Sequence, residues 1–227
     1  NYSGTLVNAL AWHFRDNPNY DVNDPRMGLV HRIDKDTSGL LVVAKTPDAK
    51  TSLGKQFFNK TTKREYIAVV WGRPEPASGR IESNIGRSMR DRLQMAVFPV
   101  GDSYGKRAVT HYETIEPLGH VSVVRCVLET GRTHQIRVHM RHLGHPLFND
   151  ARYGGDTILR GTPSASYRSF IANCFDLCPR QALHARTLGF VHPATGKEMF
   201  FSAPVPPDMQ ALIEKWRTYT NATESRI

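Results

Sequence analysis

Hydrophobic residues gather in this chain in short runs that end at Gly, Pro or Asp, as strands of a sheet do. Two β-branched runs flanked by glycine, Leu29–Val30 and Leu40–Ala44, predict buried strands. Further strands are predicted over 64–72, 79–88, 93–99, 107–117 and 120–131, and as a pair within 182–204. Because most of these runs follow one another without a helix between them, the pattern predicts an antiparallel meander.

Helical spacing marks three other segments, 47–60, 131–146 and 206–219. The first begins with Pro47, which favours a helix start, and Leu53, Phe57 and Phe58 form its apolar face. Residues 160–169 are rich in Gly, Ser and Pro and predict a flexible loop. The mixture of strands and helices predicts an α+β fold with a mostly antiparallel sheet.

Length and charge narrow the class of protein. The chain has 227 residues, of which 40% are hydrophobic, enough for one large or two small domains. Its 30 Lys and Arg against 21 Asp and Glu give a net charge of +9, which attracts polyanions such as nucleic acid or an anionic membrane. No run approaches the roughly 18 apolar residues of a membrane span, and the chain starts without a signal pattern, so we expect a cytoplasmic protein.

The cysteines and histidines do not predict a metal site. Cys126, Cys174 and Cys178 form an odd and sparse set, which we expect to be reduced, and no second ligand pair accompanies the last two. Four histidines stand close together without an interleaved carboxylate and beside arginines that repel cations: His134, His139, His142 and His145. The sequence also has no Walker-type or dinucleotide glycine pattern, so we expect no cofactor.

Two carboxylates stand among cations in the stretch 31–40, HRIDKDTSGL. The basic neighbours favour the anion of Asp34, which suits a nucleophile or a base. If the backbone is extended there, Arg32 lies on the same side as Asp34. The alternative is that Asp34 or Asp36 caps the turn at 37–39, and spacing alone favours that alternative.

The segment 131–146 predicts a short amphipathic helix, because apolar residues recur in it at helical spacing before a glycine and a proline end it. His134, Arg137 and Arg141 fall at i, i+3 and i+7 of this helix and form a cationic stripe suited to phosphates. Arg137 also suits a buried carboxylate as its partner. The stripe is equally consistent with a solvated helix face.

Two more groups have a structural and a functional interpretation. Tyr66, in a predicted strand directly after basic residues, packs in the core or, beside RNA, stacks on an extruded base. Arg87, Arg90 and Arg92 form a loop that contacts phosphates or is simply solvated. Composition and spacing leave both choices open.

Four stretches together resemble a known family. HRIDKDTSGLLVVAKT resembles the HRLDxxTSG signature of the RluA/RluD family of RNA pseudouridine synthases, with Ile33 at the position of the usual Leu. In the same order, KREYIAVVWG resembles the family's tyrosine-bearing strand, ETGRTHQIRVHMRHLGHPLFND its arginine motif, and RQALHARTLGFVHPATG its C-terminal motif. The resemblance covers about Asn1 to Lys215. It implies the family's catalytic fold over residues 1–227, with a mixed, mostly antiparallel sheet and an active-site cleft across it.

The resemblance also implies roles for single residues. Asp34 is similar to the catalytic aspartate, and Arg137 to the arginine that forms a salt bridge with it. Arg32 is similar to the arginine that fills the space left by the flipped uridine, and Tyr66 to the tyrosine that stacks on the target base. These roles answer, by resemblance alone, what spacing left open.

Other positions and a neighbouring domain follow in the same way. Ile136 is similar to an apolar residue of the base pocket, and His184 matches a position near the site. We expect contacts with the RNA backbone from a further set of cations: Arg87, Arg90, Arg92, His134 and Arg141. We expect that the family's S4-like RNA-binding domain and its first catalytic strands have no counterpart in this chain.

The chemistry implied is an isomerisation that breaks an N-glycosidic bond, rotates the uracil and forms a C–C bond without metal or nucleotide cofactor. We expect uridines of 23S large-subunit ribosomal RNA as substrate, reached by base flipping. Whether Asp34 attacks the substrate or removes the ribose C2′ proton stays open. Two other functions also stay open: a base-directed RNA glycosylase that releases uracil, and a non-catalytic RNA-binding or ribosome-assembly module. Glycoside hydrolases generally need two carboxylates about 5 to 9.5 Å apart, and the turn after Asp36 makes it a poor second one.

Overall fold

The computed structural model describes residues 3–18, 24 and 26–225. Its helices and strands follow in the order α1 (Leu6–His13), β1 (Ser38–Gly39), α2 (Pro47–Asn59), β2 (Lys63–Trp71), β3 (Ser78–Arg87), β4 (Met95–Phe98), β5 (Lys106–Leu118), β6 (Val121–Leu128), α3 (Gln135–His142), α4 (Ala165–Leu177), β7 (Leu183–Val191), β8 (Glu198–Ser202) and α5 (Pro207–Glu224). The strands predicted from 64 to 131 and within 182–204 are confirmed. The three helices predicted by periodicity are confirmed as α2, α3 and α5.

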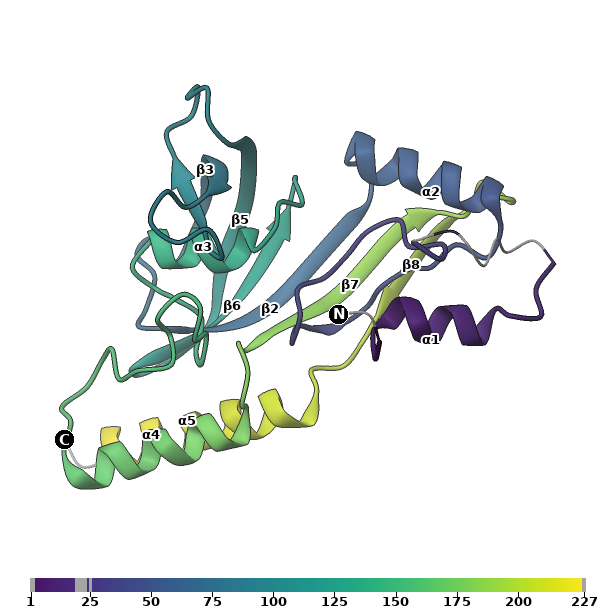
Figure 1. Cartoon of the computed structure of the whole chain (residues 1–227). Helices are drawn as coiled ribbons and strands as arrows, with labels where there is room; N and C mark the ends of the chain where they lie inside the picture. Colours follow the sequence, from purple (N-terminus) through teal and green to yellow (C-terminus); the bar gives the residue numbers. More distant parts are fainter. Residues whose placement is uncertain (1–2, 19–23, 25, 226–227) are drawn as a thin grey trace.

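All the named strands join one sheet, whose order is β1-β7-β2-β6-β5-β3-β4, with β8 also beside β7 (Figure 1). Neighbouring strands are antiparallel, except that β1 runs parallel to β7. β7 pairs with β1 through His184 and Ala185, and with β8 from Thr187 to Val191. The mixed, mostly antiparallel α+β architecture is therefore confirmed.

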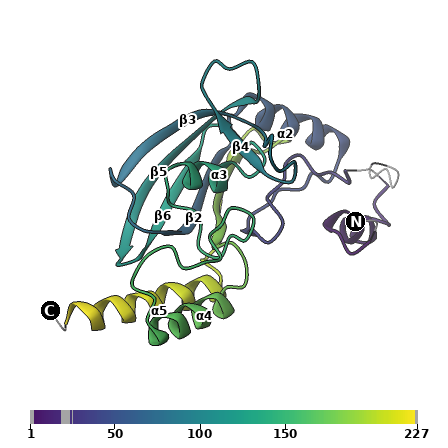
Figure 2. The same cartoon turned by 60° about the vertical axis from the view of Figure 1, so that its left-hand side comes forward.

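Strand β2 divides the two sides of the molecule, because successive side chains of a strand point to opposite faces. Ile67, Val69 and Trp71 pack in one cluster with α4 and α5. Tyr66, Ala68 and Val70 pack in a second cluster with α3. Figures 1 and 2 show α4 and α5 lying along one side of the sheet, with α3 on the other. We call these two sides the helix-pair face and the site face.

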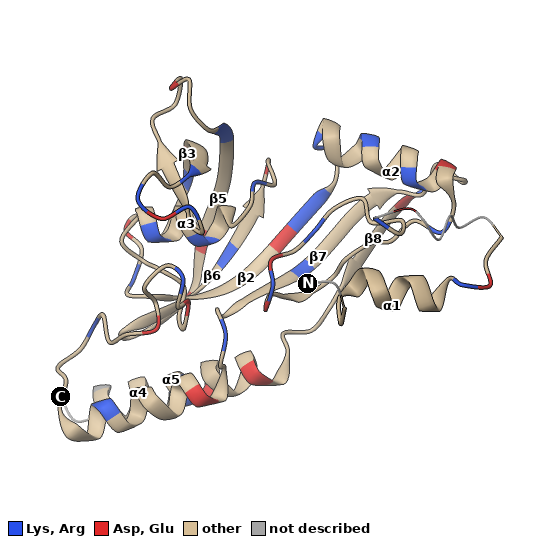
Figure 3. Ribbon diagram, viewed as in Figure 1, with Lys and Arg blue, Asp and Glu red and all other residues tan. Residues whose placement is uncertain are grey.

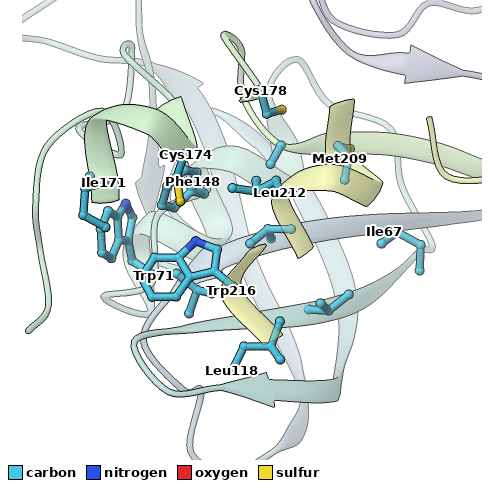
Figure 4. Packing of buried hydrophobic residues seen from close by; sticks show 14 of the residues in the cluster. Ile67, Trp71, Leu118, Phe148, Ile171, Cys174, Cys178, Met209, Leu212 and Trp216 are labelled. Carbon is cyan, nitrogen blue, oxygen red and sulfur yellow. The ribbon is translucent and has the colours of Figure 1, made fainter. Parts of the chain in front are cut away.

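The helix-pair face is closed by aromatic side chains (Figure 4). The ring of Trp71 lies 5.0 Å from that of Phe148 and 6.3 Å from that of Trp216, measured between centroids. All three residues are fully buried. The Trp71 indole also donates a hydrogen bond of 2.8 Å to the carbonyl of Gly155. This face thus forms the main apolar core.

Helix α4 corrects the prediction of a loop over 160–169, since the helix begins at Ala165. Ser164 caps it, accepting a hydrogen bond from the backbone of Tyr167. Tyr167, Ile171 and Cys174 are buried at helical spacing. Most of this apolar repeat lies beyond 169, so the polar start of the helix resembles a loop. Helix α1 was not predicted either, and none of its residues is buried.

The strands predicted at Leu29–Val30 and Leu40–Ala44 are wrong. Leu29 and Val43 form only an isolated bridge, and the strand in this region is β1 instead. These residues are mostly half-buried, because the segment runs beside the sheet rather than within it. In α2 the predicted apolar face is confirmed for Leu53, but Phe58 is exposed. Adjacent helical residues point about 100° apart, so Phe57 and Phe58 cannot share the buried face.

The cysteines are free and buried. Burial raises the pKa of the Cys126 and Cys174 thiols to about 12 and that of Cys178 to about 11, so all three stay protonated. Within the described residues, no three His, Cys, Asp or Glu side chains are placed to hold a metal ion. No helix of that part of the chain combines the length and apolar character that crossing a membrane requires.

Candidate active site

A pocket of about 680 Å³ opens on the site face. Its walls come from residues 30–34, the end of α2, the start of β2 and residues 131–136 before and within α3. These segments are distant in the sequence and are brought together by the sheet. The pocket contains the first half of the HRIDKDTSG stretch, so the chemistry-bearing motif faces a cavity.

Asp34 lies in this pocket with its side chain 14% exposed. Its Oδ2 atom is 3.6 Å from Nη1 of Arg137, whose side chain is 6% exposed. The salt bridge that the resemblance implied between these two residues is present. The guanidinium thus stands beside a carboxylate that is largely withdrawn from solvent.

Arg137 is itself held by Asp150, a fully buried carboxylate. Nε and Nη2 of the arginine donate to Oδ2 and Oδ1 of Asp150 at 2.7 and 2.8 Å, a bidentate pair. Burial works to lower the pKa of Arg137, but the hydrogen bond and charge of Asp150 and the charge of Asp34 keep it above its ordinary value. Arg137 is therefore a fixed cation shared between two carboxylates.

Tyr153 covers the guanidinium of Arg137 from one side. The Cζ atom of Arg137 lies 5.0 Å from the centroid of its ring. The Tyr153 hydroxyl contacts Nδ1 of His134 at 2.7 Å and accepts a hydrogen bond of 3.0 Å from the backbone of Met95. Burial raises the pKa of the Tyr153 hydroxyl, so it stays neutral. This contact limits the positions that Arg137 can take.

The cationic stripe expected on α3 is therefore not one solvated surface. Arg137 is buried, and His134 is half-buried at the helix start with a left-handed φ of 55°. Arg141 is exposed and donates to Oε1 of Gln94 at 2.9 Å. The periodicity correctly placed Arg137 and Arg141 on one helix, but His134 is the residue before its start. The buried partner that removes Arg137 from solvent comes from outside the helix.

The pocket has an apolar floor. Tyr66 and Ile136 are both buried and both line the cavity, together with Leu128 and Leu183. Burial raises the pKa of Tyr66, so its hydroxyl is neutral. Arg32 also lines the pocket but is exposed to solvent. Of the residues expected to bind substrate, Arg32, Tyr66, Ile136 and Arg137 thus surround or adjoin one cavity.

His31 is not one of the cations around Asp34. Its Nε2 accepts a hydrogen bond of 3.0 Å from the backbone of Val42, and its ring stacks on Phe57 at 4.2 Å. Burial, with a smaller contribution from the charge of Arg64, lowers its pKa to about 4. The imidazole is therefore neutral at pH 7 and holds the segment against α2.

The turn after Asp34 is fixed by backbone geometry. The backbone N–H of Thr37 donates to the carbonyl of Asp34 at 3.0 Å, and Asp36 has a left-handed φ of 64°. Asp36 lies within this turn through its backbone, and a capping role for its side chain stays a prediction. Gly39, with φ 114°, packs directly on the backbone of Ala185 in β7, where a Cβ atom would collide with the carbonyl oxygen. The glycine therefore lets β1 approach β7.

Two side chains that precede β7 hold this turn. Gln181 donates from Nε2 to the carbonyl of Lys35 at 2.6 Å and to Oγ1 of Thr37 at 3.2 Å. Arg180 donates to the carbonyl of Asp36 at 3.0 Å and to Oγ of Ser38 at 3.2 Å. We call Arg180 and Gln181 the turn clamp.

The turn clamp is anchored at the start of α5. Nε and Nη2 of Arg180 lie 2.7 and 3.1 Å from the two carboxylate oxygens of Asp208. Despite a partial burial that opposes it, the hydrogen bond from Arg180 keeps the pKa of Asp208 below its ordinary value. Asp208 therefore stays ionised and links the turn beside Asp34 to the helix-pair face.

His184 lies beneath the turn and does not line the pocket. Within β7, His184 pairs with Ser38 of β1, and its Nδ1 atom lies 2.9 Å from Oγ of that serine. Burial lowers its pKa, so it is neutral. The resemblance placed His184 near the site, and the structure gives it a position from which it supports the parallel pairing of β1 and β7.

Three of the arginines expected to contact RNA lie exposed around the connection between β3 and β4: Arg87, Arg90 and Arg92. Nη1 of Arg87 donates to the carbonyl of Arg92 at 2.7 Å, while Arg90 lies between them in the chain. Figure 3 shows Lys and Arg on this connection, α3, the start of β2 and α2. The loop thus adds to a basic side of the molecule.

Sequence reasoning did not identify Asp150, Tyr153 or the turn clamp. Asp150 ends the stretch that contains the arginine motif, and the turn clamp begins the C-terminal motif. A buried arginine requires a carboxylate, which was a signal that Arg137 had a partner. The identity of that partner depends on how residues 147–155 fold back beneath α3.

Known proteins are similar to this chain in sequence. The family model described as RNA pseudouridylate synthase matches residues 8–142. An uncharacterized RNA pseudouridine synthase of Chlorobaculum parvum is 47% identical over 99% of this chain and 69% of its own length. The ribosomal large subunit pseudouridine synthase D of Zymomonas mobilis is 46% identical over 94% of this chain and 64% of its own length. The chain thus spans about two thirds of the length of these relatives.

Solved structures share the fold. The human RNA pseudouridylate synthase domain containing 1 matches with a TM-score of 0.62 and 29% identity, covering 81% of this chain and 72% of the human one. The human RNA pseudouridylate synthase domain containing 4 matches with a TM-score of 0.66, covering 83% of this chain and 75% of the human one. At 24% identity this match shows a similarity of fold. The chain belongs to the RNA pseudouridine synthase family.

Proposed function

We propose that this chain converts uridine to pseudouridine in large-subunit ribosomal RNA, with Asp34 as its catalytic residue. The observation that carries the proposal is the arrangement of Asp34, Arg137 and Asp150 in a pocket of the site face. Relatives named ribosomal large subunit pseudouridine synthase D support the choice of RNA. A ribosomal RNA substrate would place the activity in the cytoplasm.

The reaction needs one carboxylate at the sugar and base. The N1–C1′ bond breaks, the uracil rotates, a C5–C1′ bond forms, and the proton on C5 leaves while N1 gains one. Asp34 can act as a nucleophile or as the base that removes the ribose C2′ proton. Arg137 positions the carboxylate of Asp34. Asp150 in turn holds Arg137, because both of its carboxylate oxygens accept hydrogen bonds from the guanidinium.

The pocket favours isomerisation over hydrolysis. Among the described residues that line it, Asp34 is the only carboxylate. Hydrolysis of a glycosidic bond generally uses a second carboxylate about 5 to 9.5 Å away to activate water. Asp36 is exposed in the turn and does not line the pocket. These facts support a synthase rather than a glycosylase.

Residues around the pocket would keep the base out of its stack. Extrusion costs a few kcal/mol, which stacking on Tyr66 and occupation of the vacated space by Arg32 offset. Ile136 forms the apolar wall, and His184 supports the turn. The RNA backbone would meet the remaining cations of the same side: Arg87, Arg90, Arg92, Arg141 and the half-buried His134.

The test is tritium release from ribosomal RNA labelled with [5-³H]uridine. The wild-type protein should release tritium, and Asp34→Asn should lower the rate roughly 10³-fold or more. Asp36→Asn is the matched control, because it changes a carboxylate two residues away that lies outside the pocket, and it should retain activity.

The result also separates the other functions. Free uracil in solution would replace the proposal by a glycosylase. Tight RNA binding by wild type with no tritium release from any ribosomal RNA would replace it by a non-catalytic RNA-binding module.

A further inference from the structure

Arg64 is a cation of the pocket that the proposed chemistry does not use. It lies in β2, two residues before Tyr66, and lines the same cavity. Residues two apart in a strand share a face, so both belong to the site face. Arg64 is half-buried, and its Nε atom is shielded from solvent without any hydrogen-bond partner.

The surroundings of Arg64 supply space but no anion. Gly131 leaves room for the guanidinium, since a Cβ atom there would lie 2.5 Å from Nη1 of Arg64. The ring of Phe57 lies 5.8 Å from its Cζ atom. His31, the titratable group beside it, is neutral. Within the described part of the chain, Arg64 forms no salt bridge with a carboxylate.

Two other arginines withdrawn from solvent near the site have a carboxylate partner. Arg137 is paired with Asp150, and Arg180 with Asp208. A desolvated cation without a partner costs free energy, and burial correspondingly lowers the pKa of Arg64. Among the described residues, Arg64 is the arginine with a buried side-chain nitrogen that has no hydrogen-bond partner, and it lines the pocket. Such a group is prepared for an anion that arrives with the ligand.

We propose that Arg64 binds a phosphate of the RNA next to the flipped uridine. This inference rests on the proposed function. The planar guanidinium offers two parallel N–H donors, which match two phosphate oxygens. Two residues of a strand advance about 7 Å, so a nucleotide whose base stacks on Tyr66 places its phosphodiester beside Arg64. Charge supports the same ligand, because the other ionised groups of the pocket are Arg32, Lys60 and Arg132 beside the single Asp34.

Arg64 thereby differs from the exposed arginines between β3 and β4. Those side chains lie in water, where salt screens their attraction for RNA and no single geometry is required. Arg64 is desolvated and fixed by its neighbours, so its contact is stronger and depends on one phosphate. It selects a nucleotide that has entered the pocket, rather than RNA at the surface.

The experiment uses a ribosomal RNA hairpin that the wild-type protein modifies, made in three forms. One is unmodified, and the others carry a neutral methylphosphonate on the 5′ or the 3′ side of the target uridine. For wild type, one of the two replacements should weaken binding about 10- to 100-fold, the usual range for a charge-assisted pair. Arg64→Gln should bind the unmodified hairpin that much more weakly and lose nothing further from the same methylphosphonate.

Lys60→Gln is the matched control, since it removes an exposed cation that also lines the pocket. The fold-loss of affinity caused by Lys60→Gln and that caused by the methylphosphonate should multiply when the variant binds the modified hairpin. If the losses of Arg64→Gln and of both methylphosphonates also multiply, Arg64 does not bind either phosphate and the inference is overturned, while wild-type isomerisation still stands. If wild type modifies no ribosomal RNA, the proposed function fails first.

A second variant tests the prepared cation without RNA. Arg64→Met keeps the aliphatic stem and removes the unpaired charge. The free protein should then unfold at the same or a higher temperature, because a desolvation cost has been relieved. A markedly lower unfolding temperature would show that Arg64 has a structural partner and would overturn the inference.

Discussion

The two faces of the sheet are built on different principles, although both use β2. On the helix-pair face, Trp71 packs among aromatic and aliphatic side chains of α4 and α5. On the site face, the alternate residues pack with α3, beside a set of buried polar and charged groups: Thr110, Gln135, Arg137, His139 and Asp150. The comparison shows one face that supplies cohesion and another that holds functional groups in fixed positions.

The polar groups of the site face are largely satisfied by one another. Gln135 bonds Thr110, Thr130 and the backbone of Val109. His139 contacts Thr110 through Nδ1 and Ser83 through Nε2, both at 2.9 Å. Such a network is rigid because each lost bond would leave a buried group unpaired. It therefore holds the walls of the pocket in fixed positions, and it makes the stability of this face depend on the charge of its buried groups.

The largest effect on stability is expected from the helix-pair face. Trp216→Ala removes a fully buried indole and should lower the free energy of unfolding by about 3–5 kcal/mol. Denaturant titration measures the loss. Since Trp216 does not line the pocket, kcat per folded molecule should stay near that of wild type. A marked fall of kcat per folded molecule in Trp216→Ala would mean that the packing of the helix-pair face and the activity of the site face are not separable.

The site face should respond to pH instead. Burial, with the charge of His142 as a smaller cause, lowers the pKa of His139 to about 4 from 6.5. Between pH 4 and 6.5, His139 is protonated in the unfolded chain but neutral in the folded chain. Its contribution to the free energy of unfolding is therefore complete above pH 6.5 and decreases as the pH falls below this value. It is lost at about 1.4 kcal/mol per pH unit between 6.5 and 4.

Unfolding of wild type and His139→Gln at several pH values measures this contribution. The slope between pH 4 and 6.5 should be smaller in the variant but not zero, because burial also lowers the pKa of His31, to about 4, and that of His184. Trp216→Ala serves as the comparison and should keep the wild-type slope. Equal slopes in wild type and His139→Gln would contradict a neutral, buried His139.

The turn clamp joins the two faces and should affect catalysis more than binding. Arg180→Gln loses the donors to the turn and to Asp208, so the carboxylate of Asp34 shifts. We expect kcat to fall roughly 10- to 100-fold with little change in KM, because misplacement acts on the transition state. Arg168→Gln, an exposed change on α4, is the control. An unchanged kcat would reduce the clamp to a packing role.

The smallest effect per residue is expected at the exposed loop. Replacing Arg87, Arg90 and Arg92 together by Gln should lower the slope of log Kd against log salt by roughly 2, since each phosphate contact contributes about 0.7 to 0.9. Thermal unfolding should be unaffected. A salt slope equal to that of wild type would show that these residues are only solvated surface.

Much of this molecule was accessible from sequence. Short apolar runs ended by turn residues predicted the strands from β2 to β8, because these signals are local. The motifs identified Asp34 and Arg137, and the pair is present. The predicted strands at Leu29–Val30 and Leu40–Ala44 failed, since a short apolar run does not show whether it pairs within a sheet or lies beside it.

Tertiary structure alone decided how the charges are distributed. Arg137 and Arg64 are both arginines within basic motifs, and nothing local distinguishes them. Asp150 reaches Arg137 because the chain folds back beneath α3, whereas no carboxylate reaches Arg64 among the described residues. The sequence by itself determined which residues can carry charge and which segments form strands and helices. Long-range packing determined which charges are neutralised within the protein and which one is left for a ligand, because the partner of a buried ion lies far away in the chain.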